Sequence, residues 1–252
     1  MTNKRLTIVI VGASSGLGRA VATEYASRGW LVGVCARREQ PLAELASRFP
    51  ENIRYRTLDV TAPDSGQQFI DFVTSLGGMD IVLYAAGCGW NNPELDEAND
   101  ERTVQTNVVG FTRVVNAAFK WFANNVTPSG NTGHLCAITS IAGTKGIGIS
   151  ATYSATKRYQ NTYLESLSQL ASVKKANLTI TDIRPGFIDT DLLDTSSHKY
   201  PMLMSVPYAC KRIVRAIDKH RHVAYIDWRW NIVTKLWSFI PRCLWTRLKL
   251  SI

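Results

Sequence analysis

The sequence predicts an α/β protein in which helices cover both faces of a parallel sheet, with a helical extension at the C-terminus. Short apolar runs alternate with amphipathic stretches along most of the chain, and a glycine-rich turn joins the first run to the first such stretch. Strands buried on both faces form nearly continuous apolar runs, and right-handed helical crossovers connect parallel neighbours. The length of 252 residues fits one such domain. We therefore expect a doubly wound sheet in three layers.

The predicted strands and helices alternate in chain order from the N-terminus. The first apolar run, residues 6–11, leads directly into glycines and is too short for a secretory signal, so we expect a strand. Five further runs predict strands at residues 31–36, 53–58, 81–85, 134–139 and 178–183. Amphipathic stretches predict helices at residues 18–28, 41–49, 64–76, 102–124 and 152–174. No linker and no apolar segment of transmembrane length interrupts this order.

A glycine-rich loop, residues 12–18, joins the first strand to the first helix. Its sequence, Gly-Ala-Ser-Ser-Gly-Leu-Gly, has glycines where a side chain would block a tight turn and the approach of a pyrophosphate. The helix that begins there offers free N–H groups and a partial positive charge to an anion. We expect this loop to bind a dinucleotide through Gly12, Ser14, Ser15, Gly16, Leu17 and Gly18.

The ends of the second and third strands indicate which dinucleotide is bound. Sites for NAD usually place an acidic residue at the end of the second strand, but Arg37 and Arg38 stand here instead. Arginine binds a ribose 2′-phosphate through charge-assisted hydrogen bonds, so we expect NADP(H) as the cofactor. The alternative is that both arginines are solvated charges. Asp59, followed by Val60, is placed to bond the adenine or to cap its strand.

A Tyr-x-x-x-Lys pair, Tyr153 and Lys157, stands near the start of the helix predicted at residues 152–174. Residues four apart share one face of a helix, and a nearby ammonium lowers the pKa of a tyrosine from about 10. Such a tyrosine can exchange protons near neutral pH. Ser140 ends the fifth strand, and ligands of doubly wound sheets bind beyond the carboxyl ends of the strands. We therefore expect these three side chains to face one cleft.

These residues belong to a longer series of motifs along the chain. In order they are residues 12–18, Asp59, Ala86-Gly87, Asn107, Ser140, Tyr153 with Lys157, and Pro185-Gly186 followed by Ile188 and Thr190. In this series, over about residues 5–195, the chain resembles the short-chain dehydrogenase/reductase family. The resemblance implies a Rossmann-type fold and an oxidoreductase that transfers hydride between NADP(H) and a carbonyl or alcohol. It also implies a homodimer or homotetramer, with the helices at 102–124 and 152–174 as candidate interfaces.

The resemblance further implies a role for each motif residue. Tyr153 would act as general acid or base, Ser140 would stabilise the oxyanion, and Lys157 would bond the ribose and lower the pKa of Tyr153. Asn107 would hold a water that links Lys157 to solvent. The cofactor would be bound by Asp59, Val60, Ala86, Gly87, Tyr153, Lys157, Pro185, Gly186, Ile188 and Thr190.

Other functions stay open on the sequence alone. A non-catalytic NADP-binding sensor or scaffold shares the fold but does not need Asn107, Ser140, Tyr153 and Lys157 together. An epimerase or dehydratase on this fold usually has a longer chain. The substrate is not identified by the sequence, although apolar residues near the expected cleft favour an apolar carbonyl or alcohol, such as a lipid or steroid-type carbonyl at a membrane.

The net charge of +9 is unevenly distributed. Residues 1–202 hold 19 basic and 18 acidic residues, whereas residues 203–252 hold 10 basic residues and only Asp218 and Asp227 as acids. We divide the chain into a catalytic domain, residues 1–228, and a basic, Trp-rich amphipathic extension, residues 229–252. A substrate lid is expected at about residues 187–204 within the first part.

The extension has an apolar residue at every fourth position: Ile232, Leu236, Ile240, Leu244 and Leu248. Pro241 is expected to divide this stripe into two short helices. We expect the extension to pack on the protein body or on a partner subunit. The alternative is contact with a membrane surface, where Trp and basic residues beside an apolar face are favoured. Nucleic acid is not expected, because no aromatic and basic platform occurs elsewhere.

The cysteines bear on location and on metal binding. Five of them are widely spaced and include no CxxC pair, which predicts reduced thiols and neither a disulfide framework nor a metal site. We expect a cytoplasmic protein, with peripheral attachment to a membrane surface as the alternative.

Overall fold

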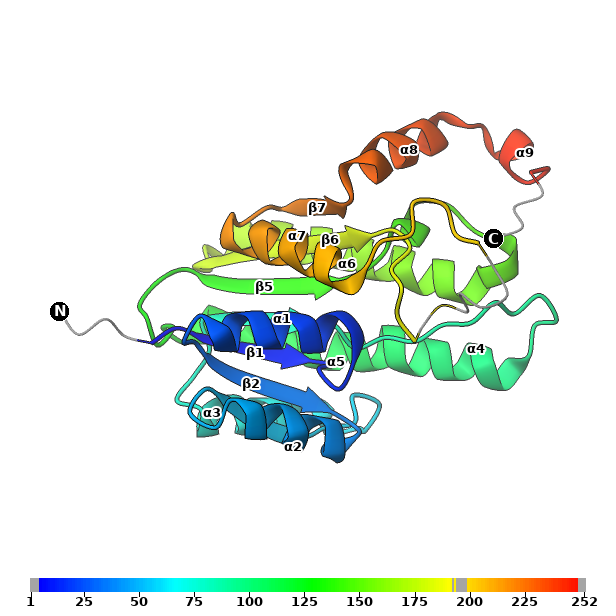
Figure 1. Ribbon diagram of the computed structural model, residues 1–252. Coiled ribbons are helices and arrows are strands. Elements are labelled where there is room, and N and C mark those ends of the chain that lie inside the picture. The colour runs from blue at the N-terminus through cyan, green and yellow to red at the C-terminus, as the bar shows by residue number, and fades with distance from the viewer. Residues whose placement is uncertain (1–4, 192, 194–198, 249–252) are drawn as a thin grey trace.

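A parallel sheet forms the centre of the protein (Figure 1). The computed structural model describes residues 5–191, 193 and 199–248. Within these residues, seven strands lie in the order β3-β2-β1-β4-β5-β6-β7, and all neighbouring pairs are parallel. The strands are β1 (Thr7–Val11), β2 (Leu31–Ala36), β3 (Ile53–Thr57), β4 (Ile81–Tyr84), β5 (Gly133–Ile138), β6 (Leu178–Pro185) and β7 (Val223–Ile226). The predicted doubly wound sheet is therefore confirmed.

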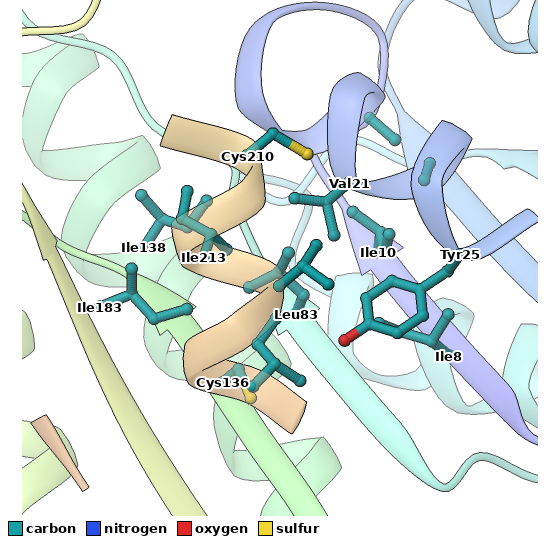
Figure 2. Close-up of a cluster of buried hydrophobic side chains, with 14 of the residues drawn as sticks. Ile8, Ile10, Val21, Tyr25, Leu83, Cys136, Ile138, Ile183, Cys210 and Ile213 are labelled. Atoms are coloured by element: carbon teal, nitrogen blue, oxygen red, sulfur yellow. The ribbon is translucent and has the colours of Figure 1, made fainter. Parts of the chain in front are cut away.

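Helices cover both faces of this sheet and complete the three predicted layers. One face carries α1 (Gly16–Ser27), α2 (Glu39–Arg48) and α7 (Val206–Asp218). The other face carries α3 (Ser65–Ser75), α5 (Phe111–Asn124) and α6 (Ala151–Lys174). Apolar side chains of the strands divide into two buried clusters, one under each helical layer. Figure 2 shows the first cluster, which includes Ile8 and Ile10 of β1, Tyr25 of α1 and Ile213 of α7.

The direction of chain progression reverses between β1 and β4. β2 and β3 extend the sheet on one side of β1, whereas β4 to β7 extend it on the other side. The connections that leave β1 and β4 therefore run to opposite faces, and ligands of such sheets bind beyond the carboxyl ends of these two strands. The loops after β1 and β4 thus locate the candidate site.

The helix predicted at residues 102–124 differs in the structure. It begins earlier, as α4 (Glu97–Val104), because the side chain of Asp96 accepts a hydrogen bond from the N–H of Asn99 and caps the first turn. A π-helical segment, η1 (Gln105–Gly110), then separates α4 from α5. π-Helical segments are rare in proteins, and those that occur are often found at functional sites. Asn107 lies in this segment.

Two elements near the C-terminus, α7 and β7, are absent from the predicted set. α7 does have apolar residues at helical spacing, including Cys210, Ile213 and Ile217, but basic residues stand between them. β7 is four residues long and forms one edge of the sheet. The apolar run that would predict this strand is weak, because only Ala224 and Ile226 are buried and the apolar Val223 is exposed.

The C-terminal extension forms two helices, α8 (Trp228–Phe239) and α9 (Arg242–Trp245), separated at Pro241 as predicted. In Figure 1 they lie beyond β7 at one edge of the molecule. One side of α8 packs on the body, since Trp230 belongs to the same core cluster as residues of β1 and α1. Among the residues described, no helix combines the length and the apolar character needed to cross a lipid bilayer.

The predicted substrate lid, residues 187–204, is described only in part. Residues 192 and 194–198 lie outside the described residues. At the base of the segment, Ile188 and Met204 form an isolated parallel bridge, and Met204 donates its N–H to the carbonyl oxygen of Phe187. The two ends of the segment are therefore held together just beyond β6.

Candidate active site

The glycine-rich loop after β1 lies directly against the residues that follow β4. A Cβ atom on Gly12 would stand 2.4 Å from the backbone nitrogen of Ala86, and one on Gly18 would stand 2.2 Å from the carbonyl oxygen of Gly12. Gly12 also has a φ of 96°, which residues with side chains rarely adopt. The loop is so tightly closed that only glycine fits at either position.

The N-terminus of α1 has the character of an anion site. Ser15 is the N-cap residue, but its side chain makes no capping hydrogen bond. Instead, the guanidinium of Arg38 donates to the hydroxyl oxygens of Ser14 and Ser15, at 3.1 Å in each case. Thr190 lies close to the same loop, since its Cγ2 is 3.6 Å from the position of a Cβ on Gly16. Residues that follow β1, β2 and β6 thus meet at one helix end.

Four further predicted cofactor residues are Leu17, Arg37, Asp59 and Val60. Arg37 is exposed. Asp59 is also exposed, and its Oδ1 accepts hydrogen bonds from the N–H and the hydroxyl of Thr61, so the capping role considered for Asp59 is present. Val60 is buried and packs on η1, and the side chain of Leu17 packs against the core under α1.

Ser140, Tyr153 and Lys157 come together beyond the end of β5. Ser140 is buried in extended backbone directly after that strand. Its side chain hydrogen-bonds the hydroxyl of Tyr153, which lies in the first turn of α6. Lys157 is one turn further along α6, and its Nζ is 5.6 Å from the centroid of the Tyr153 ring. The structure therefore brings the three predicted side chains to one place.

The protonation of this group differs from the sequence prediction. Burial raises the pKa of Tyr153 to about 12, and the hydrogen bond from Ser140 opposes this rise. Burial also lowers the pKa of Lys157 to about 8, and the nearby carboxylate of Asp182 opposes this change. The lowered pKa predicted for Tyr153 is wrong for this structure, because desolvation of the phenolate dominates. Tyr153 is consequently a protonated phenol at neutral pH.

Asn107 is fully buried in η1 and fixes the loop after β4. Its amide nitrogen donates to the carbonyl oxygen of Cys88 at 2.7 Å, and its Oδ1 accepts from the N–H of Cys88 at 3.0 Å. Gln160 donates to the main-chain oxygen of Asn107 and accepts from Lys157 at 3.0 Å. Gly87 lies beside Asn107 and Lys157, since a Cβ on Gly87 would stand 3.4 Å from Oδ1 of Asn107 and 3.5 Å from Nζ of Lys157.

Two residues outside the predicted catalytic and cofactor-binding residues complete this site. Gln160 stands three residues after Lys157 on α6, so helical spacing from Lys157 is the signal that could have found it. Gly89 supports the other side of the site. A Cβ there would stand 2.1 Å from Cδ2 of Tyr153, so the ring lies on the Gly89 backbone. A contact between residues so far apart in the chain leaves no signal in the sequence.

The Pro185-Gly186 turn after β6 is shaped by the C-terminal extension. A Cβ atom on Gly186 would stand 2.0 Å from Nε1 of Trp230 in α8. The space where a side chain of Gly186 would lie is therefore filled by the indole ring. Ile188, two residues after Gly186, is buried in the core cluster that also contains Trp230. The contacts predicted between these residues and the nicotinamide stay predictions.

A buried carboxylate ties β6 to β5 and α6 beneath the site. Asp182 is almost completely buried, and Arg184 pairs with it at 2.7 Å. The carboxylate also accepts hydrogen bonds from the hydroxyl of Thr139 at 2.6 Å and from the amide nitrogen of Asn161. Because Thr139 precedes Ser140 and Asn161 lies on α6, this network fixes the two elements that carry the Ser-Tyr-Lys group.

The buried ammonium of Lys157 predicts a pH-dependent cost in stability. Its pKa is about 8 in the folded chain, against about 10.4 for an unfolded chain, so between these values the unfolded chain binds more protons and stability rises with pH. Below about pH 8 the full cost is present. We expect Lys157→Met to raise the free energy of unfolding by about 1–3 kcal/mol near pH 7, and the difference to shrink toward about pH 10. Urea unfolding at both pH values measures it.

Lys120→Met is the matched control, because Lys120 is an exposed lysine on α5. It is expected to change the free energy of unfolding by less than about 0.5 kcal/mol at either pH. A Lys157→Met variant that is less stable than the wild type near neutral pH would contradict the expected cost of the buried charge.

The fold and the site together define an oxidoreductase of the doubly wound α/β class. A glycine-rich loop follows β1, and a Ser-Tyr-Lys group, in which Ser140 and Lys157 are buried, lies beyond the carboxyl end of β5. The family model described as short chain dehydrogenase matches residues 6–201. The chain belongs to this family, which confirms the resemblance found in its motifs.

Similar proteins support the same classification. An uncharacterized oxidoreductase of Mycobacterium tuberculosis is 30% identical over 250 residues, which cover 94% of this chain and 95% of the relative. An uncharacterized oxidoreductase of Myxococcus xanthus is 29% identical over 244 residues and 94% of each chain. These relatives span nearly the whole chain, but their names specify no substrate.

Solved structures share the fold. The structure of ElxO with NADP bound has a TM-score of 0.76 at 23% identity and covers 88% of this chain and 97% of its own. The NADH-dependent reductase A1-R′, responsible for alginate metabolism, has a TM-score of 0.74 at 22% identity and covers 88% and 96%. At these identities the likeness extends to the fold alone.

Proposed function

We propose that the protein catalyses the NADP(H)-dependent interconversion of a carbonyl and an alcohol. The observation that carries this proposal is the meeting of Ser140, Tyr153 and Lys157 in a chain of the short chain dehydrogenase family. A dinucleotide is supported by the glycine-rich loop, because the first turn of α1 has no side-chain cap and its N–H groups can face a pyrophosphate. When bound, the nicotinamide would supply or accept the hydride.

Tyr153 is the proposed acid and base. With a pKa of about 12 it holds its proton at neutral pH and can donate it to an oxygen that becomes negative during carbonyl reduction. Ser140 hydrogen-bonds Tyr153 and would bond the same substrate oxygen. Lys157 places a positive charge near the ring, which stabilises the phenolate once the proton has left. Gln160 holds Lys157 in this position.

The choice of NADP(H) is supported by the end of β2. Arg37 and Arg38 stand where sites for NAD usually place an acidic residue, and Arg38 already lies over the hydroxyl groups of the glycine-rich loop. ElxO was solved with NADP bound and A1-R′ is named NADH-dependent, so this fold accommodates either cofactor. The two guanidinium groups are therefore the features that favour the extra phosphate of NADP(H).

We expect the wild type to use NADPH at least about tenfold more efficiently than NADH, measured as kcat/KM. Arg38→Asp and Arg37→Asp are each expected to reduce this ratio by at least about tenfold, because the new carboxylate repels a 2′-phosphate. Arg48→Asp makes the same charge change at the other end of α2 and should leave the ratio unchanged. Equal use of both cofactors by the wild type would refute the assignment.

The activity itself is tested by following NADPH oxidation with a panel of ketones, aldehydes and quinones. Turnover of at least one carbonyl class is expected. A protein that binds NADPH tightly but turns over no member of the panel would instead be a non-catalytic sensor of NADP. Assembly into a homodimer or homotetramer and a cytoplasmic location remain predictions beside this proposal.

A further inference from the structure

The C-terminal helices present a row of large apolar side chains to solvent. One side of α8 is buried, since Trp230 lies in the core and Trp237 packs against it. The opposite side leaves Ile232 at 50%, Leu236 at 62% and Phe239 at 82% exposed. We use the name C-terminal apolar face for the exposed apolar side chains of α8 and of the segment after it, which are Trp228, Ile232, Leu236, Phe239, Leu244 and Leu248. It includes most of the stripe that the sequence predicted.

This face is fixed in place on the protein body. Lys145 donates a hydrogen bond to the carbonyl oxygen of Ile240 at 2.8 Å, just after α8. The indole N–H of Trp245 in α9 donates to the carbonyl oxygen of Gly146 at 2.7 Å. Both anchors lie in the segment that connects Ser140 to Tyr153. Because Trp230, Trp237 and Trp245 occupy the inner side, the exposed side chains cannot turn inward without unpacking the tryptophans.

The charge around this face is positive. Lys235, Arg242 and Arg247 are exposed on the same two helices or directly after them. The only acidic residues after residue 202 are Asp218 and Asp227, and these already pair with Arg28 and Arg229. A partner that covers the face therefore meets apolar side chains surrounded by cations that lack acidic neighbours in this segment.

We propose that the C-terminal apolar face binds the surface of an anionic lipid bilayer. Helices with an apolar face and basic residues beside it lie in the membrane interface, and acidic headgroups complement the cations. A second copy of this chain fits less well, since a two-fold contact through the face would set the same basic residues against each other. Nucleic acid also fits less well, because four of the six side chains of the face are aliphatic.

Co-sedimentation with vesicles tests this proposal on the full-length protein. We expect the wild type to bind vesicles of phosphatidylglycerol and phosphatidylcholine, mixed at about equal amounts, more strongly than vesicles of phosphatidylcholine alone. Binding should weaken as salt is raised toward about 1 M, because screening removes the attraction between headgroups and basic side chains. Absence of binding to the anionic vesicles would overturn the proposal.

A double variant, Leu236→Glu with Phe239→Glu, tests the role of the face directly. Both side chains are exposed, so the fold should persist, as thermal unfolding can verify. We expect the coefficient for partition onto anionic vesicles to fall by at least about tenfold. The apolar contacts of Leu236 and Phe239 with the lipid would be lost, and two negative charges would approach the acidic headgroups. Val126→Glu is the matched control, since Val126 is also 82% exposed but lies after α5. It should bind like the wild type.

Two further results would overturn the proposal. The first is a double variant that binds anionic vesicles as strongly as the wild type does. The second is a wild type that forms an oligomer in sedimentation analysis, fails to bind lipid, and becomes monomeric in the double variant, because a second copy would then cover the face. Neither readout depends on the carbonyl reductase activity, so the two proposals can fail separately.

Discussion

Tyr153→Phe is expected to lower kcat for carbonyl reduction by about 100- to 10,000-fold, the range that general acid catalysis contributes. The change removes only the hydroxyl that Ser140 hydrogen-bonds, and it keeps the ring that lies on the Gly89 backbone. The glycine-rich loop and Arg38 are untouched, so NADPH affinity, measured by fluorescence titration, should stay within about twofold. Loss of turnover without loss of cofactor binding assigns the hydroxyl to the chemical step.

Tyr163→Phe provides the comparison on the same helix. Tyr163 is ten residues further along α6, and its hydroxyl donates to Asn116 instead of facing the site. This variant should keep the wild-type kcat. If Tyr153→Phe retained more than a few per cent of the wild-type kcat, another group would have to be the acid. If it lost NADPH affinity as well, its main role would be structural.

The position of the site could be predicted because parallel strands bring their carboxyl ends to one edge. The glycine-rich loop follows β1 and Ser140 follows β5, so topology alone places both at that edge. Helical spacing then adds Lys157 to Tyr153. These inferences use only short distances along the chain and the direction of each strand, both of which are readable from the sequence.

The electrostatics of the site could not be predicted in the same way. The Tyr-Lys spacing favours a lowered tyrosine pKa, but the pKa of Tyr153 depends mainly on how much of the chain covers it. That cover includes Gly89, whose contact with the ring has no counterpart in local spacing. Burial of a side chain is a property of the folded molecule, and it outweighs the local pattern here.

The orientation of the C-terminal helices could not be predicted from the sequence either. The aliphatic stripe, with one residue at every fourth position, favours an inner face. In the structure, however, Leu236 and Leu244 are exposed while Trp230 and Trp245 are buried. Both sets recur at helical spacing, so periodicity alone cannot choose between them. The choice is made by the shape of the Pro185-Gly186 turn, which accepts an indole ring.

Trp230→Ala is expected to lower the free energy of unfolding by about 3–5 kcal/mol, the usual cost of removing a buried tryptophan. Trp230 is among the largest fully buried side chains and is only 2% exposed. It fills the space beside Gly186 and contacts the rings of Phe187 and Trp237. Truncation leaves a cavity between α8 and the end of β6 that neither backbone can close. Urea unfolding gives the loss directly.

Trp228→Ala is the matched control, because Trp228 lies two residues earlier on α8 and is 64% exposed. It should change the free energy of unfolding by less than about 0.5 kcal/mol. A similar small cost for both variants would mean that α8 does not dock on the body through Trp230. A large cost for Trp230→Ala alone would show that the extension supports the turn beside the candidate site. In that case α8 packs on the protein body with one side and exposes the C-terminal apolar face on the other.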